Sequence, residues 1–314
     1  MSRGYTLIEL IVTIAIMLIL GAGAVSAYLF VFKKGAEAPV ILKDEMELQL
    51  SLAQLLKDVE SIGFGLTKNY FNAGNSCTLV DLLSNNQSVS ICTASGYELL
   101  LLSLSTRNTR DSGCWGYTDK TGCVFINSGT KSVLGFDCPN SGLNPAEYIA
   151  TDFYKNSTFS CTANSACSSG IQCGEDRLVF YLGSGNAYPD SFAARYFLSN
   201  TNLPGDCAPG TFVLEKEHLN DIPQPVISCV HTFRAFYMVQ SGTGFSYTTT
   251  PPSNIDDLRG IRLCFIVQIG KKRDASLTPP NFSANCGGSA SFTAEQRNYR
   301  WKVVELDIPV RNLQ

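Results

Sequence analysis

The sequence is poor in histidine and lacks the short motifs of common enzymes. Its only histidines are His218 and His231, and it has no Cys-x-x-Cys pair, which argues against zinc ribbons and haem attachment. It has no Gly-x-Ser-x-Gly, no phosphate-binding loop and no Gly-x-Gly-x-x-Gly. Neither histidine lies beside a recognisable Ser or Cys nucleophile. We therefore expect no catalytic residues, no cofactor and no bound metal.

Charge is also scarce. Charged residues make up 16% of the chain, the net charge is −3 and the pI is about 5.5, so we expect no nucleic-acid partner. Asp256 and Asp257, with Asn254, form an acidic turn that could bind calcium. One adjacent pair falls short of the spaced ligands that calcium prefers, and a solvated turn is the better interpretation.

No charged residue occurs from Leu10 to Phe32, in a chain of 314 residues. A helix needs roughly 20 apolar residues to cross a membrane, so this run predicts a span. A secretory signal cut near Ala22-Gly23-Ala24 is the alternative, but its apolar core would be shorter. We favour cleavage between Gly4 and Tyr5, which keeps the apolar helix.

The residues Gly4-Tyr5-Thr6-Leu7-Ile8-Glu9-Leu10 resemble the class III signal of type IV prepilins and pseudopilins. The resemblance implies that prepilin peptidase cuts after Gly4 and that Tyr5 becomes N-methylated. Most relatives have Phe at the position of Tyr5. Glu9 matches the acidic residue that the family has at the fifth position after the cut.

Glu9 heads the apolar run, and a carboxylate in a membrane helix is costly without a partner. In a bundle of such helices it would pair with the free Tyr5 ammonium of a neighbouring subunit, and an unpaired carboxylate would penalise wrong registers. The alternative is an interfacial carboxylate that reaches the lipid headgroups.

Twelve cysteines follow the apolar run, and an even number of this size predicts disulfides in an oxidising compartment. Spacing alone does not fix their connectivity. Local interpretations are Cys114–Cys123 and one pair among Cys161, Cys167 and Cys173. The candidates are Cys77, Cys92, Cys114, Cys123, Cys138, Cys161, Cys167, Cys173, Cys207, Cys229, Cys264 and Cys286.

We predict an α+β, pilin-like fold: a long N-terminal helix packed on an antiparallel β-sheet domain with disulfide-rich loops. An apolar stripe of Leu48, Leu52, Leu55, Val59 and Ile62 indicates the amphipathic half of that helix, which Gly35 and Pro39 would loosen. The predicted parts are a leader (1–4), a membrane and assembly helix (5–32), its amphipathic continuation (33–64) and an extracytoplasmic β domain (65–314) with a cysteine-rich insert around 72–221.

Strand signals fill the rest of the chain. Strict alternation of Ile261, Leu263, Phe265, Val267 and Ile269 places Arg262 on the opposite face. A shift in the pattern between Val303 and Val304 suggests a bulge, and 140–169 has the composition of a surface loop. The predicted strands are 98–105, 176–183, 195–199, 211–217, 226–240, 260–270 and 299–310, with a hairpin at 114–127.

A second resemblance is to PilW-type minor pilins. It rests on 56–65, where Asp58 is followed by Gly63-Phe64-Gly65, and on the Arg-Asn near the C-terminus. It implies a minor pilin that forms part of a type IV pilus or primes its assembly. The implied partners are other major and minor pilins, prepilin peptidase, a PilY-type tip adhesin, and membrane lipid before assembly.

Two other functions stay open: a GspJ-like minor pseudopilin of type II secretion, and a membrane-anchored, disulfide-rich binding domain. The cysteines place the bulk of the chain on the oxidising side of the membrane. We therefore expect an inner-membrane protein with a cytoplasmic N-terminus and a periplasmic domain, which reaches the cell surface after assembly.

Overall fold

The computed structural model describes residues 7–67, 80–82, 99–105, 110–183, 193–218, 222–250, 252 and 254–313. The chain divides into two units, residues 1–49 and 50–314, and each is described by itself.

Helix α1 runs from Leu7 to Glu60. It continues through Gly35 and Pro39, where we expected loosening. Pro39 cannot donate to the carbonyl four residues earlier, which belongs to Gly35, and a residue without a side chain leaves the backbone room to adjust there. Among the described residues, no helix combines the length and apolar character that a membrane span requires. The predicted segment 5–32 includes residues outside this description.

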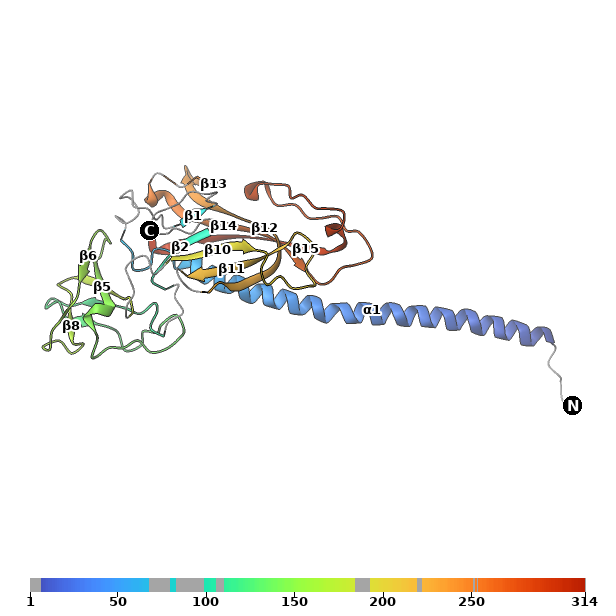
Figure 1. Cartoon of the computed structure of the whole chain (residues 1–314), viewed down its shortest axis with the longest axis horizontal. Helices are drawn as coiled ribbons and strands as arrows, with labels where there is room; N and C mark the ends of the chain where they lie inside the picture. The colour runs from blue at the N-terminus through green and yellow to red at the C-terminus, as the bar shows by residue number, and fades with distance from the viewer. Residues whose placement is uncertain are drawn as a thin grey trace. The chain divides into compact units, whose positions relative to one another are not determined.

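An eight-stranded antiparallel sheet forms the main layer of the second unit (Figure 1), which confirms the predicted antiparallel β domain. Its order is β1-β2-β10-β11-β12-β14-β15, and β13 pairs with β12. The strands are β1 Val80–Leu82, β2 Leu99–Leu102, β10 Ala193–Ser199, β11 Phe212–His218, β12 Gln224–Ser241, β13 Gly244–Thr248, β14 Leu258–Ile269 and β15 Arg300–Pro309.

Strand β14 is the centre of the core because both of its faces are covered. On the face predicted from the alternation, Phe265 stacks on Phe233 with ring centroids 4.6 Å apart. On the other face, Cys264 and Ile266 pack in a cluster with Trp301 of β15 and with side chains of the connection between β14 and β15. Four short 3-10 helices accompany these two strands: one before β14, two between β14 and β15, and one after β15. They are Ile255–Asp257, Ala284–Cys286, Gln296–Asn298 and Arg311–Leu313.

The predicted bulge in the last strand is wrong. β14 and β15 pair in continuous register, with Phe265 opposite Val304 and Ile266 opposite Val303. Val303 packs against the cluster on the second face, and the adjacent Val304 lies on the opposite face of the sheet. Val303 and Val304 are both apolar because both faces of the sheet are covered here, and the strand contains no extra residue.

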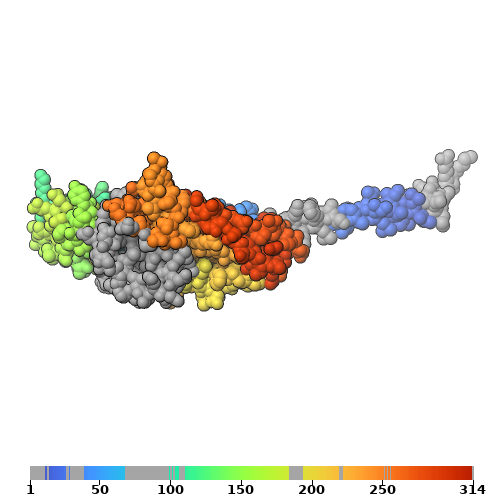
Figure 2. All heavy atoms as spheres, turned by 90° about the horizontal axis from the view of Figure 1, so that it is seen from above, coloured from blue at the N-terminus to red at the C-terminus, as the bar shows by residue number. Residues whose placement is uncertain are grey.

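Residues 110–183, here called the cysteine-rich module, form a second sheet with its own core (green in Figure 2). The sheet order is β4-β3-β9-β5-β6, and β7 pairs with β8 beside it. The elements are β3 Trp115–Thr118, β4 Val124–Phe125, the 3-10 helix Pro145–Glu147, β5 Tyr148–Asp152, β6 Thr158–Ser160, β7 Thr162–Ala163, β8 Ile171–Gln172 and β9 Arg177–Tyr181.

The hairpin predicted at 114–127 is confirmed by the pairing of β3 with β4. The surface loop predicted at 140–169 is wrong, because β5, β6 and β7 lie within it. These strands are two to five residues long, so their apolar alternation is too short to detect. Tyr148 and Ala150 of β5 are buried in the module core.

Ten of the candidate cysteines form five disulfides. The local interpretation Cys114–Cys123 is wrong, since both residues bond more distant partners. The pair expected among Cys161, Cys167 and Cys173 is Cys161–Cys173. Cys77 and Cys92 lie outside the described residues. The disulfides are Cys114–Cys138, Cys123–Cys167 and Cys161–Cys173 in the module, and Cys207–Cys229 and Cys264–Cys286 in the main domain.

Removing a module disulfide should destabilise the module more when the loop that it closes is longer. The sequence separation is 44 residues for Cys123–Cys167 and 12 for Cys161–Cys173. In the chain-entropy description, Cys123→Ser/Cys167→Ser should cost about 4 kcal/mol and Cys161→Ser/Cys173→Ser about 3 kcal/mol. Urea unfolding followed by hydrogen exchange of peptides from the module measures both. A reversed order would contradict the expectation.

Candidate assembly site and the anchorage of its helix

The end of α1 is fixed by glycines and by contacts with the strand β2 region. Gly63 and Gly65 have φ angles of 77° and 73°, the left-handed conformation in which glycine is favoured. The Leu104 amide donates to the Phe64 carbonyl at 3.1 Å. A Cβ atom on Gly65 would lie 2.2 Å from Leu104 Cδ1, so a side chain at this position would force the buried Leu104 to move. The helix stop predicted at Gly63-Phe64-Gly65 is confirmed.

A buried ion pair joins the last turn of α1 to the main sheet. Lys216 Nζ of β11 lies 2.5 Å from Asp58 Oδ2, and both side chains are nearly inaccessible, at 5% and 11% exposed. Tyr196, opposite Lys216 on β10, donates its hydroxyl to the same carboxylate oxygen. Burial, and next the Asp58 carboxylate, raise the pKa of Tyr196 well above its ordinary value, so the phenol is neutral. The Asp58 cluster, defined as Asp58, Tyr196 and Lys216, fixes the helix on the sheet.

The C-terminal segment ties the helix end to the cysteine-rich module. Asn312 Nδ2 donates to the Glu60 carbonyl at 3.1 Å, one of the carbonyls that a helix end leaves without a partner. Lys155 of the module donates to the Asn312 carbonyl at 2.9 Å. Lys57 of α1 donates to the Val133 carbonyl at 3.0 Å. Three segments far apart in sequence therefore meet where the helix ends.

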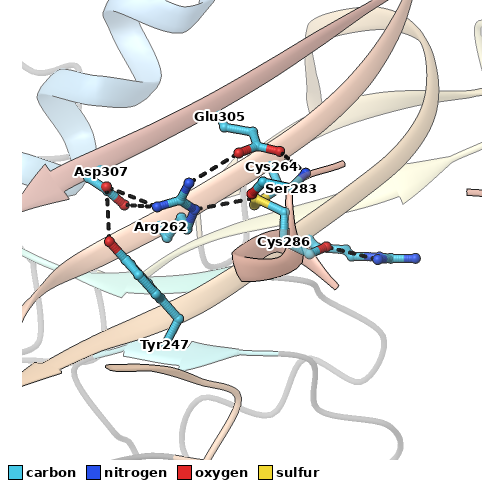
Figure 3. A network of polar contacts seen from close by, with 8 residues as sticks. Tyr247, Arg262, Cys264, Ser283, Cys286, Glu305 and Asp307 are labelled. Atoms are coloured by element: carbon cyan, nitrogen blue, oxygen red, sulfur yellow. Dashed lines mark hydrogen bonds and ion pairs between the residues drawn. A yellow bond between two sulfur atoms is a disulfide. The ribbon is translucent and has the colours of Figure 1, made fainter. Parts of the chain in front are cut away.

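A second polar network crosses the outer part of the sheet (Figure 3). Arg262 of β14 lies 3.1 Å from Glu305 and 3.0 Å from Asp307, both on β15. Tyr247 donates to Asp307 at 3.1 Å, and Arg262 Nε lies 3.3 Å from Cys286 Sγ. Burial by itself would raise the pKa of the Glu305 carboxyl. Hydrogen bonds from Ser283 and Arg262 outweigh burial and lower this pKa below its ordinary value. The network holds the β15 edge, β13 and the 3-10 helix at Cys286 together.

The histidines and the acidic turn occupy structural positions. His231 lies beside Phe292 with ring centroids 4.2 Å apart, and burial is the largest cause that lowers its pKa. His218 ends β11. Asn254 accepts the Asp256 amide at 3.0 Å, which turns the chain at the acidic pair. Among the described residues, no three His, Cys, Asp or Glu side chains gather as a metal site would require.

The sequence-predicted processing residues, Gly4 and Tyr5, lie outside the described residues. Glu9 lies in α1, and its side chain is also outside the description. The Asp58 cluster and the Asn312 contacts were missed, although Asp58 lies in the motif at 56–65 and Asn312 in the C-terminal one. Both residues stand in motifs that the sequence shows, but the residues that they contact are more than a hundred positions away in the sequence.

Comparison with protein families identifies the N-terminal segment. Residues 1–25 match the prokaryotic N-terminal methylation motif. This match supports a type IV pilin-like class III signal, related to a pilus or a pseudopilus, and implies processing by prepilin peptidase and assembly with other pilins. It suggests an anchor in the inner membrane. No curated protein and no solved structure matches the chain.

Proposed function

We propose that this protein is a minor pilin of the PilW kind, which primes a type IV pilus or forms part of it. The observation that carries the proposal is the methylation motif at residues 1–25, in which Glu9 heads the charge-free run. A helix of this kind can pack in a bundle of like helices, where the Tyr5 ammonium of one subunit neutralises the Glu9 carboxylate of the next. The role is structural rather than enzymatic.

The anchorage of α1 supports the same role. When a helix holds a subunit in a filament, force applied to the globular domain must pass to that helix. The Asp58 cluster and the Asn312 capping bond join the two with partners from β10, β11 and the C-terminus. A bulky domain with a module of 74 residues (110–183) is difficult to repeat along a shaft, which favours a position at the tip, where a PilY-type adhesin would be a neighbour.

A GspJ-like minor pseudopilin is the second candidate, because the methylation motif serves both machines. A membrane-anchored binding domain is the third, and it predicts an uncleaved N-terminus or a cut after the apolar run.

Mass spectrometry of the N-terminal peptide of the native protein tests the proposal. We expect the peptide to begin at Tyr5 and to carry one added methyl group, because prepilin peptidase methylates the terminus that it creates. Deletion of the host's prepilin peptidase should leave the peptide starting at Met1 or Ser2 without the methyl group. A wild-type peptide that begins at Met1 or after Ala24 would exclude both the pilin and the pseudopilin.

A further inference from the structure

The cysteine-rich module exposes three aromatic rings on one face of its sheet. Trp115, Tyr117 and Phe125 are 44%, 49% and 42% exposed. Trp115 and Tyr117 alternate on β3 with residues buried in the module core, and Phe125 lies opposite Tyr117 on the edge strand β4. The Tyr117 and Phe125 rings are 6.2 Å apart and nearly parallel, at 22°. These residues are called the aromatic face.

The backbone of the hairpin is adapted to this arrangement. A Cβ atom on Gly116 would lie 2.3 Å from the Phe125 carbonyl oxygen, so glycine is needed for β4 to lie so close to β3. The disulfides Cys114–Cys138 and Cys123–Cys167 begin at residues that flank the two strands. The aromatic face is therefore held rigidly, which lowers the entropy cost of binding.

A pocket of about 270 Å³ adjoins this face, because Trp115 is also part of its wall. Its polar lining is Lys57, Asp58 and Ser61 at the end of α1, Ser105 after β2, and Lys131 and Ser132 of the module. Lys131 is paired with Asp137. Lys57 is exposed and donates to the Val133 carbonyl, and within the described part of the chain no carboxylate forms an ion pair with it. The Asp58 carboxylate in the wall is paired with Lys216, so the pocket offers hydroxyl groups and one cation, Lys57, that is not paired with a carboxylate.

The two surfaces together define the chemistry of a ligand. Aromatic rings carry negative charge on their faces and attract weakly positive C–H groups, such as those on the apolar face of a pyranose. Hydroxyl and ammonium groups in a concave site fix polar substituents. The pocket is slightly smaller than the about 300 Å³ at which sites for drug-sized ligands begin, so it accommodates one unit of a longer molecule.

We propose that the aromatic face and the adjoining pocket bind an acidic oligosaccharide. One uronic acid unit occupies the pocket with its carboxylate at Lys57, and the following units stack on Trp115, Tyr117 and Phe125. An extended apolar peptide fits less well, because it has no carboxylate to accept a charge-assisted hydrogen bond from the Lys57 ammonium. The site lies in the second unit and is independent of the proposed helix bundle.

Calorimetric titration of the full chain in detergent with an oligogalacturonate tests the proposal, with the neutral galactan oligosaccharide of equal length as the matched ligand. We expect the acidic ligand to bind and the neutral one to bind at least about tenfold more weakly, because the neutral ligand lacks the carboxylate that accepts from the Lys57 ammonium. Trp115→Ala should weaken binding of the acidic ligand about tenfold or more, as loss of a stacking ring does for nucleobases.

Tyr154→Ala is the matched control, because Tyr154 is 80% exposed in the same module but is outside the aromatic face. It should leave the affinity unchanged. Lys57→Gln should remove the preference for the acidic ligand, and Lys120→Gln, in the neighbouring hairpin turn, should not. Absence of binding, equal binding of both saccharides, or tighter binding of a single-stranded oligonucleotide would overturn the proposal. None of these outcomes depends on cleavage at Gly4. They test the oligosaccharide site alone, and the N-terminal peptide tests the proposed function.

Discussion

Glu9→Leu is expected to abolish incorporation of the protein into filaments while leaving the chain in the membrane. If Glu9 pairs with the Tyr5 ammonium of a neighbouring subunit, leucine leaves that ammonium buried and unpaired in the bundle. Breaking such a pair from one side costs about 3–5 kcal/mol, which is roughly a hundredfold or more in the assembly equilibrium. Immunoblots of sheared filaments against total membranes measure the incorporated fraction.

Glu47→Leu is the matched control for this variant. Glu47 also lies in α1, but its side chain is 64% exposed and forms an ion pair with Lys43 outside the charge-free run. An exposed pair contributes about 0–1 kcal/mol, so incorporation should stay near the wild-type level. The N-terminal peptide of each variant must first be shown to begin at Tyr5, which separates assembly from processing. Normal incorporation of Glu9→Leu would contradict the pairing.

Lys216→Met is expected to be the most destabilising single substitution in the globular domain. It leaves the Asp58 carboxylate buried, with the Tyr196 hydroxyl as the remaining donor of the Asp58 cluster. Removing one partner of a buried pair costs about 3–5 kcal/mol, a large share of the 5–15 kcal/mol that stabilises a typical domain. Urea unfolding of the full chain in detergent, followed by circular dichroism of the β-sheet, measures the loss.

Two variants separate the buried charge from the general effect of losing a lysine. Lys272→Met removes an ion pair with Glu295 that is about half exposed on both sides, at 52% and 53%, and should leave the free energy of unfolding nearly unchanged. The double variant Asp58→Leu/Lys216→Met removes both charges and should regain most of the stability, because no isolated charge stays buried. If Lys216→Met costs as little as Lys272→Met, the ion pair does not anchor the helix.

Local patterns in the sequence predicted the elements whose signal is short-range. The motif from Gly4 to Leu10 identified the methylation signal that the family comparison also finds. The alternation from Ile261 to Ile269 predicted β14, and Gly63 and Gly65 predicted the helix stop. Each of these signals depends on neighbours within a few residues, through cleavage geometry, strand pleat or backbone conformation.

The cysteine pairing and the module strands were not predictable in the same way. Cys123 bonds Cys167 rather than nearby Cys114 because β3, β4 and the β7–β8 ribbon are brought together by the module core. Strands of two to five residues, such as β6 and β7, carry too few positions to show alternation. Both faces of the main sheet are covered at Val303 and Val304, so the apolar pair in the sequence resembled a bulge that the strand does not have.

The sequence by itself determined the processing signal, the disulfide-rich character and the approximate positions of β10, β11, β12, β14 and β15 along the chain, because these depend on residue type and short-range spacing. Only the tertiary structure decided which distant groups meet: Asp58 with Lys216, Asn312 with Glu60, and Trp115 with the pocket at Lys57. Such contacts depend on how strands far apart in sequence pair and pack, and a one-dimensional pattern does not record that choice.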